Sequence, residues 1–248
     1  MEYIEFLDEY KTFEGKHLQR VALSKDCEHG TKGTKGGWVE NLTSIYDQAW
    51  IADNAILLGN ATIREKAVIK GDCIIKNSAK IYGNAIISGK VIVSHKAQVF
   101  ENAQVKDNCI VKDEAKVSGD TILKDDCVLW GKATLFGGEW IESPFQAQGP
   151  THFISESRPG YLHIGCIEKS YEGWIVDGYR TAKKFDAERN NEYVKYESYI
   201  EPIILKYLDY SEKNWDDLSL IQKGTYKIVK SKAEKYLANK KNDKFKRD

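Results

Sequence analysis

Residues 79–102 read AKIYGN, AIISGK, VIVSHK and AQVFEN, four consecutive six-residue units that share one pattern. The first residue of each unit is small, the third is aliphatic, and the last two are turn formers or charged residues. The pattern extends in both directions, and sixteen units run from Thr43 to Gly138 without an insertion. The third residue of every unit is aliphatic: Ile45, Ile51, Leu57, Ile63, Ile69, Ile75, Ile81, Ile87, Val93, Val99, Val105, Val111, Val117, Leu123, Leu129 and Leu135. An amphipathic helix has a period of about 3.6 residues, so this repeat excludes it.

Each unit predicts one short β-strand followed by a turn. Two inward side chains separated by one outward residue are typical of a strand, whose side chains alternate between its faces. Three such strands per coil give a parallel β-helix of about five coils, each rising about 4.8 Å. Proline is absent from residues 1–143, as expected where every backbone N–H donates to a neighbouring coil. The sequence therefore predicts a mainly β fold, a single-stranded, three-sided parallel β-helix over residues 37–142.

The repeat resembles the hexapeptide-repeat, left-handed β-helix superfamily. It is more specifically similar to hexapeptide proteins of phages and prophages, which carry a Gly-Gly-Trp-[IV]-Glu sequence before the first unit. Here that sequence reads Gly36-Gly37-Trp38-Val39-Glu40. Such proteins also end in a small α/β cap with a Gly-Cys pair and a helix with an aromatic anchor, here Gly165-Cys166 and Trp174. The resemblance covers roughly residues 12–210 and implies left-handed coiling, which the period alone does not determine.

The segments on either side of the repeat predict two caps. Residues 1–36 contain short β segments and would form an N-terminal β cap, because the open end of a solenoid exposes backbone donors and apolar side chains. Residues 143–248 predict an α/β cap followed by C-terminal helices. An alternating strand over residues 161–167 would bury Cys166, and Ser211 is a candidate N-cap for a helix that contains Trp215.

Outward side chains can be assigned to faces, because every third unit returns to the same side. The fourth positions of one face are Tyr46, Arg64, Tyr82, Phe100, Ser118 and Phe136. Second positions form two mainly apolar rows: Ile56, Ile74, Ile92, Ile110 and Val128, and Trp50, Val68, Ile86, Gln104 and Ile122. Such rows are larger than the apolar patches that monomers usually expose. We expect the C-terminal helices or a second copy of the chain to cover them, the latter in a dimer or a trimer.

Lysines beside these rows are candidate ligand-binding residues. Five occupy fourth positions: Lys70, Lys106 and Lys124 on one face, and Lys76 and Lys112 on another. They either solubilise a sheet face and discourage edge pairing, or bind an anion. In the second interpretation the lysines hold the phosphate groups of a nucleotide-like ligand, in a cleft that Tyr82 and Phe100 also line.

A catalytic role would depend on one histidine. The best-known enzymes with this fold are acyltransferases that use acyl-CoA and place a histidine base near a subunit boundary, commonly beside a loop that leaves the prism. His95 is the only histidine within the repeat, and in this alternative it would deprotonate the acceptor, with acyl-CoA as cofactor. No loop interrupts the sixteen units, so we expect neither catalysis nor a cofactor.

Metal chemistry is not indicated. Cys73, Cys109 and Cys127 occupy small first positions and are expected to be core residues. Cys27 and His29 are the only Cys/His pair close in sequence, and two ligands do not make a zinc site. We therefore predict no metal site.

The charge distribution limits the classes of partner that the protein can bind. Lys plus Arg and Asp plus Glu each number 37, which excludes a globally basic nucleic-acid-binding protein. The end of the chain is basic and predicts a Lys-rich helix over about residues 225–239, which is solvated, binds an acidic surface of the same chain, or contacts nucleic acid. No apolar run approaches the roughly 18 residues of a membrane span, and the N-terminal residues do not resemble a signal peptide. We expect a cytoplasmic protein, in the host cytoplasm if phage-encoded.

These observations predict a non-enzymatic, homo-oligomeric binding protein. The resemblance suggests a phage-type host-interaction or counter-defence factor, which sequesters a small phosphate-bearing, nucleotide-like ligand or occludes a host protein. Two alternatives remain: an acyl-CoA-dependent acyltransferase of the hexapeptide family that uses His95, and a structural component of a virion or scaffold.

Overall fold

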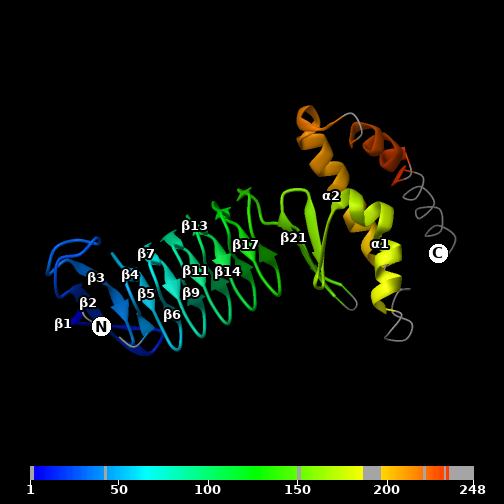
Figure 1. Ribbon diagram of the computed structural model, residues 1–248. Coiled ribbons are helices and arrows are strands. Elements are labelled where there is room, and N and C mark those ends of the chain that lie inside the picture. The colour runs from blue at the N-terminus through cyan, green and yellow to red at the C-terminus, as the bar shows by residue number, and fades with distance from the viewer. Residues whose placement is uncertain are drawn as a thin grey trace. The chain divides into compact units, whose positions relative to one another are not determined.

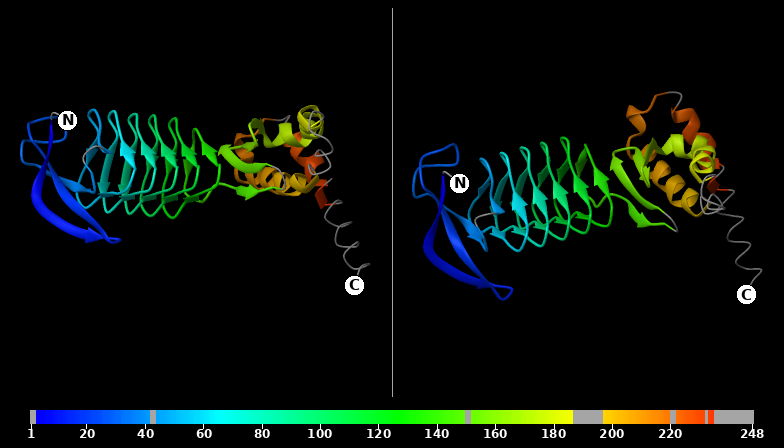
Figure 2. Two further views of the ribbon diagram at one scale, coloured as in Figure 1. Left: turned by 90° about the horizontal axis from the view of Figure 1, so that it is seen from below. Right: turned by 60° about the horizontal axis from the view of Figure 1, so that its bottom comes forward.

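The computed structural model describes residues 3–41, 44–149, 152–186, 197–219, 222–231 and 233–234. The fold is mainly β, and its main part is a parallel β-solenoid of about six turns (Figures 1 and 2). Residues that differ by eighteen in number pair in parallel, as Ile92 does with both Ile74 and Ile110. Three six-residue units therefore make one coil, which confirms the fold class that the repeat predicts.

The strands of the solenoid form three sheets. The first has the order β1-β2-β3-β5-β8-β11-β14-β17. It contains β1 (Ile4–Phe13), β2 (Lys16–Leu23), β3 (Lys35–Val39), β5 (Ile56–Leu57), β8 (Ile74–Ile75), β11 (Ile92–Val93), β14 (Ile110–Val111) and β17 (Val128–Leu129). The second contains β4 (Trp50–Ile51), β7 (Val68–Gly71), β10 (Ile86–Gly89), β13 (Gln104–Val105), β16 (Ile122–Leu123) and β19 (Glu139–Trp140). The third contains β6 (Thr62–Ile63), β9 (Lys80–Ile81), β12 (Gln98–Val99), β15 (Lys116–Val117) and β18 (Thr134–Leu135).

The six-residue pattern determines both the interior and the corners. The aliphatic third positions and the alanines and cysteines at first positions are buried. At the corners, fifth positions such as Asp53, Asn77 and Asp107 adopt positive φ, which Asn, Asp and Gly tolerate better than other residues. Their side chains accept a hydrogen bond from the backbone N–H of the next coil, as Asp53 does from Gly71 at 2.8 Å. The turn-forming residues of the repeat thus also connect successive coils.

The solenoid has more turns than the five that the sixteen units predict. β3 precedes the first unit and pairs in parallel with β5, while β19 follows the last unit and pairs in parallel with β16. Around β3, Gly37 and Val39 still match the small first and aliphatic third positions, but Leu42 replaces the turn former. In β19, Trp140 pairs with Leu123, seventeen residues earlier, so this strand is out of register with the repeat. The repeat alone therefore understates the length of the solenoid.

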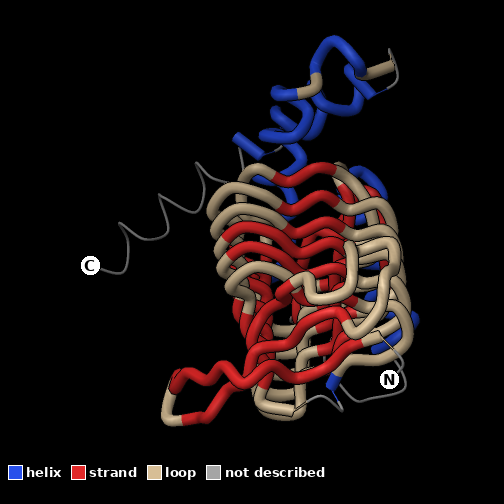
Figure 3. The backbone as a smooth tube through the Cα atoms, turned by 90° about the vertical axis from the view of Figure 1, so that its left-hand side faces the viewer, coloured by secondary structure: helices blue, strands red, loops and turns tan. Residues whose placement is uncertain are grey.

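The β1–β2 hairpin covers part of an apolar row, a role that we expected of the C-terminal helices or a second copy. Its two-residue turn, Glu14-Gly15, has positive φ at both positions, as hairpin turns favour. Phe13 and Ile74 both pack against a buried cluster that includes Ile56. Figure 3 shows the hairpin in front of the stacked coils. The row is thus buried at its N-terminal end by a segment from outside the repeat.

The chain divides into two compact units. One comprises residues 1–146 and 155–158, and the other residues 147–154 and 159–248. The division that the sequence predicts, at residues 36 and 142, stays a prediction. A further sheet has the order β20 (Gln146–Gln148), β21 (Phe153–Arg158), β22 (Tyr161–Ile164) and β23 (Ile167–Ser170).

The second unit is partly helical and differs from two sequence-based expectations. It contains α1 (Tyr171–Asp186), α2 (Glu197–Lys213), the 3₁₀ turn η3 (Trp215–Asp217) and helical residues 222–231. The aromatic anchor Trp174 is buried, and its indole N–H donates to the Leu162 carbonyl at 2.9 Å. Cys166 is exposed, because Gly165 (φ 63) turns the chain between β22 and β23. Ser211 lies buried inside α2 and does not begin a helix.

Candidate functional site

The predicted ligand-binding residues lie on three different sheets. Lys70 lies in β7 of the second sheet and Lys106 and Lys124 follow strands of that sheet, whereas Lys76 and Lys112 follow strands of the first. Tyr82 and Phe100 follow strands β9 and β12 of the third sheet. The structure therefore brings the two aromatic residues together and separates them from all five lysines.

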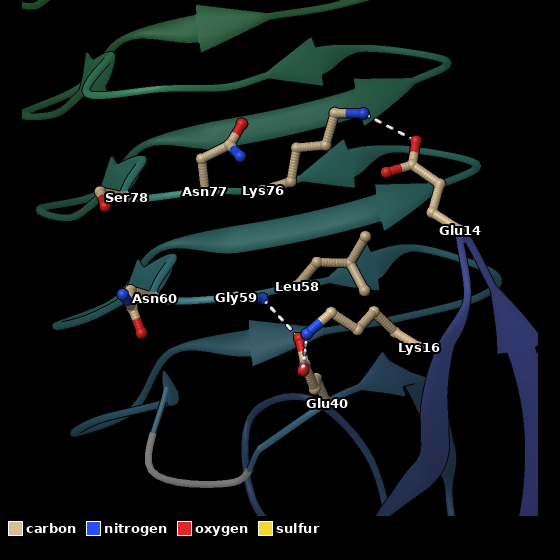
Figure 4. A pocket seen from close by; sticks show the side chains of 9 residues that line it. All are labelled: Glu14, Lys16, Glu40, Leu58, Gly59, Asn60, Lys76, Asn77 and Ser78. Carbon is tan, nitrogen blue, oxygen red and sulfur yellow. Dashed lines mark hydrogen bonds and ion pairs between the residues drawn. The ribbon is translucent and has the colours of Figure 1, made fainter.

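Lys76 lines a hollow of about 400 Å³ between the hairpin turn and two coils (Figure 4). Its ammonium pairs with the Glu14 carboxylate at 2.7 Å, and Lys16 pairs with Glu40 at 2.9 Å. Glu40 also accepts a hydrogen bond from the Gly59 backbone N–H at 2.7 Å. These two hydrogen bonds, the one from Lys16 foremost, lower the pKa of Glu40. Two ammonium groups face two carboxylates, so we call this site the neutral hollow.

Lys124 also forms an ion pair with a carboxylate. Its ammonium lies 2.5 Å from the carboxylate of Glu139, the first residue of β19. The hydrogen bond between them raises the pKa of Lys124 and lowers that of Glu139. An anionic ligand at this lysine would have to compete with the charge of Glu139.

Tyr82 and Phe100 stack on successive coils of the third sheet. Their ring centroids are 4.9 Å apart and their planes differ by 6°. The Tyr82 hydroxyl donates to Oε1 of Gln98 at 3.2 Å. This contact leaves the Nε2 amide of Gln98, a hydrogen-bond donor, for another partner.

Beside this aromatic pair lies a hollow of about 320 Å³ that the sequence analysis missed. It is lined by Lys96, Gln98, Glu114, Lys116, Lys132 and Thr134, and we call it the basic hollow. Three ammonium groups face one carboxylate there, that of Glu114, which lies 3.8 Å from Lys96. Among the residues that the structure describes, none forms an ion pair with Lys116 or Lys132. The basic hollow therefore has an excess of positive charge that the neutral hollow lacks.

The signal for the basic hollow was present in the repeat. Gln98, Lys116 and Thr134 are second positions of the third face, and Lys96, Glu114 and Lys132 are sixth positions of the corner before it. The sequence analysis grouped lysines by fourth positions only. Combining second and sixth positions of the same side would have placed three lysines beside Tyr82 and Phe100.

His95 occupies an exposed corner, with 60% of its side chain accessible. Its backbone has a φ of 60° and donates to Oδ1 of Asn77 at 3.2 Å. Nδ1 lies 3.2 Å from the Ser94 hydroxyl and 3.9 Å from the Asp113 carboxylate. A relay would need the serine and the carboxylate on opposite ring nitrogens, so these contacts do not form a catalytic triad.

Cys27 and His29 line a hollow of about 300 Å³ near the N-terminus, together with Tyr3 and Lys66. The His29 ring stacks on Trp50 with centroids 5.9 Å apart, and its Nε2 lies 2.8 Å from the Gln48 carbonyl oxygen. The Tyr3 hydroxyl donates to the Ala49 carbonyl at 2.6 Å. Burial is the main reason that the pKa of Tyr3 is raised. These contacts attach the N-terminal segment to the first coil and leave little of the cluster for chemistry.

The basic residues of the C-terminal helical segment contact their own unit. Lys230 forms an ion pair with Glu212 at 3.0 Å, and Lys223 lies over the Trp215 ring, 5.4 Å from its centroid. The Tyr226 hydroxyl also donates to Glu212. Residues 235–248, the remainder of the basic end, lie outside the described residues. Of these lysines, Lys230 thus pairs with an acidic residue of the same chain.

Metal binding and membrane insertion are two further possibilities for the described part of the chain. No group of three or more His, Cys, Asp or Glu side chains is placed to hold a metal ion there. None of the described helices has the length and apolar character needed to cross a bilayer. Neither a protein-family model nor a curated protein matches this sequence.

Proposed function

We propose that this protein acts by binding and that its ligand is a small phosphate-bearing molecule held at the basic hollow. The observation that carries the proposal is the charge of that hollow, where Lys96, Lys116 and Lys132 face a single carboxylate. Lysine ammonium groups are common phosphate ligands. A phosphate would supply the negative charge that no described side chain provides to Lys116 and Lys132.

Neutral donors add to this charge. The free amide of Gln98 and the hydroxyl of Thr134 line the same hollow, and both can donate to phosphate oxygens. The three lysines are exposed, so their attraction for an anion is screened by water and salt. We expect an affinity that falls as ionic strength rises.

Calorimetric titration with inorganic pyrophosphate tests this proposal. We expect binding at low salt, weakened at high salt, and weakened at least about tenfold in Lys116→Ala, because hydrogen bonds to charged groups contribute about 1.5–3 kcal/mol. The matched control is Lys70→Ala, an exposed lysine on the second sheet, which should bind as the wild type does. A wild type that binds no pyrophosphate, or equal losses in both variants, would refute the proposal.

The wider role follows the resemblance and is proposed on that basis. We infer a left-handed hexapeptide-repeat protein of phage type that sequesters a nucleotide-like ligand in the cytoplasm as a host-interaction or counter-defence factor. The uninterrupted six-residue units and the Gly36–Glu40 sequence support this assignment. Neither acyl transfer by His95 nor a purely structural role is favoured by a specific contact in the described residues.

We also propose that the protein is a homo-oligomer. Ile92, Ile110 and Val128 continue the apolar row beyond the hairpin and are only half-buried. A second copy would remove these side chains from water. Light scattering coupled to size-exclusion chromatography tests this point: a dimer or trimer is expected, and a strict monomer at high concentration would contradict it.

A further inference from the structure

One row of the third face carries a ring or a guanidinium on almost every coil. The row, which we call the ring row, consists of fourth positions and of Arg158, which continues it: Tyr46, Arg64, Tyr82, Phe100, Ser118, Phe136 and Arg158. Arg64 lies over the Tyr46 ring at 4.7 Å, and Arg158 lies over the Phe136 ring at 5.6 Å. Tyr82 and Phe100 stack at 4.9 Å. Three pairs of stacked planar groups therefore lie along this row.

Arg158 belongs to the row because the strand that contains it hydrogen-bonds to the last repeat strand as a further coil would. The Ser118 N–H donates to the Leu135 carbonyl at 2.8 Å, and in the same way the Phe136 N–H donates to the Ser157 carbonyl at 3.0 Å. Phe136 follows the acceptor Leu135 and stands one coil beyond Ser118 in the row. Arg158 follows the acceptor Ser157 and stands one coil beyond Phe136 in the same way. The Phe136 ring thus has Arg158 on one side along the row and Ser118 on the other.

Ser118 is the only member of the ring row without a planar group. It is only 6% exposed, and its hydroxyl is already satisfied, because it donates to the Leu135 carbonyl at 3.2 Å. Phe100 and Phe136 stand two coils apart on either side of it, about 10 Å at a rise of about 4.8 Å per coil. One ring placed over Ser118 would lie about 5 Å from each neighbour, which matches the 4.9 Å spacing of Tyr82 and Phe100.

We propose that the ligand carries a planar aromatic ring, which stacks over Ser118 between Phe100 and Phe136 while its phosphate lies in the basic hollow. This inference rests on the proposed function and specifies its ligand class. Lys116 precedes Ser118 by two residues and points to the same face, at about 6–7 Å along the strand. A short sugar-sized linker between ring and phosphate spans that distance. The site therefore fits a nucleoside monophosphate.

A comparison of adenosine 5′-monophosphate with ribose 5-phosphate separates the contribution of the ring to the affinity from that of the phosphate, because ribose 5-phosphate lacks only the base. We expect the wild type to bind the nucleotide about tenfold more tightly, as base stacking on aromatic side chains is worth about five- to a hundredfold. In Ser118→Phe the protein's own ring would fill the place. The nucleotide should then bind no better than ribose 5-phosphate, whose affinity should stay within about twofold of wild type.

Matched variants keep the test decisive. Ser88→Phe makes the same change at a fourth position of the second sheet and should alter neither affinity. Phe100→Leu removes one wall of the ring site and should weaken only the nucleotide, which covers the case in which Ser118→Phe fails to fold. If the wild type binds both ligands equally, the ring site is refuted and the phosphate site stands. If it binds neither, both are refuted.

Discussion

The neutral hollow and the basic hollow are built by the same repeat but differ in their charge. The repeat directs Lys76 into the first and three lysines into the second, and the neutral hollow also contains Lys16 from the hairpin. In the neutral hollow, Glu14 from the hairpin and Glu40 from the end of β3 each pair with a lysine. In the basic hollow, Lys116 and Lys132 have no carboxylate partner among the described residues. The repeat thus places the lysines, and the flanking segments decide which of them are available.

The pairing of Lys76 is a long-range contact. Glu14 is 62 residues away in sequence and reaches Lys76 only because the two-residue turn of the hairpin lies over the first coils. No corresponding segment adds carboxylates to the basic hollow, whose lining residues all belong to the repeat. The fold therefore divides the lysines of one repeat into paired and unpaired groups.

The largest expected effect separates the two hollows directly. The double variant Lys116→Ala/Lys132→Ala should lose at least about a hundredfold in affinity for pyrophosphate, because two charge-assisted hydrogen bonds disappear. The double variant Lys16→Ala/Lys76→Ala removes the same charge from the neutral hollow and should bind within about twofold of wild type. Titration calorimetry at low salt measures both. Similar losses in the two variants would show that only overall charge matters.

A second variant sharpens the difference by removing the last carboxylate from the basic hollow. Glu114→Gln should tighten pyrophosphate binding about threefold, since an exposed like charge near the ligand costs less than about 1 kcal/mol. Asp120→Asn, an exposed acidic residue at a different corner, is the control and should leave the affinity unchanged. Weaker binding in Glu114→Gln would mean that Glu114 positions Lys96 and does not repel the ligand.

A third variant makes the neutral hollow resemble the basic one. Glu14→Gln leaves Lys76 without its 2.7 Å partner, so a second, weaker pyrophosphate site should become detectable at low salt. The free energy of unfolding should fall by less than about 1 kcal/mol, because the ion pair is partly exposed. Competition by added salt should abolish the second site first. A stoichiometry unchanged from wild type would contradict the charge argument.

The smallest expected effect is a pH dependence of the free energy of unfolding that arises in the neutral hollow. Hydrogen bonds from Lys16 and the Gly59 N–H hold the pKa of Glu40 below its ordinary value of 4.5. The resulting stability is therefore fully present above about pH 4.5 and is lost as the pH falls through the lower, folded-state pKa. We expect a contribution below about 1 kcal/mol, seen in urea unfolding as a step that Glu40→Gln lacks. An identical pH profile in both proteins would exclude this role for Glu40.

Most of the solenoid could be predicted, because each unit specifies its own strand and corner. Aliphatic third positions such as Ile81 and Val99 are buried in every coil, so one short pattern repeated sixteen times determines the core. The last-turn strand β19 and the exposed Cys166 were missed, since neither follows a period. In the second unit the helix that contains Trp174 was expected from the resemblance, whereas Ser211 was misplaced because its burial inside α2 depends on tertiary contacts.

The candidate site was predicted only in part. The stacking of Tyr82 on Phe100 follows from their separation by one coil, and the sequence analysis had identified both. Lys116 and Lys132 could have been found by assigning second and sixth positions to faces. The pairing of Lys76 with Glu14 could not, because it depends on where the hairpin folds back.

A crystal structure of the protein with adenosine 5′-monophosphate tests the central claim most directly. The account predicts the phosphate in the basic hollow, within hydrogen-bond distance of Lys116 and Lys132, and the base over Ser118 between the rings of Phe100 and Phe136. Nucleotide bound in the neutral hollow near Lys76, or no bound nucleotide at saturating concentration, would contradict it.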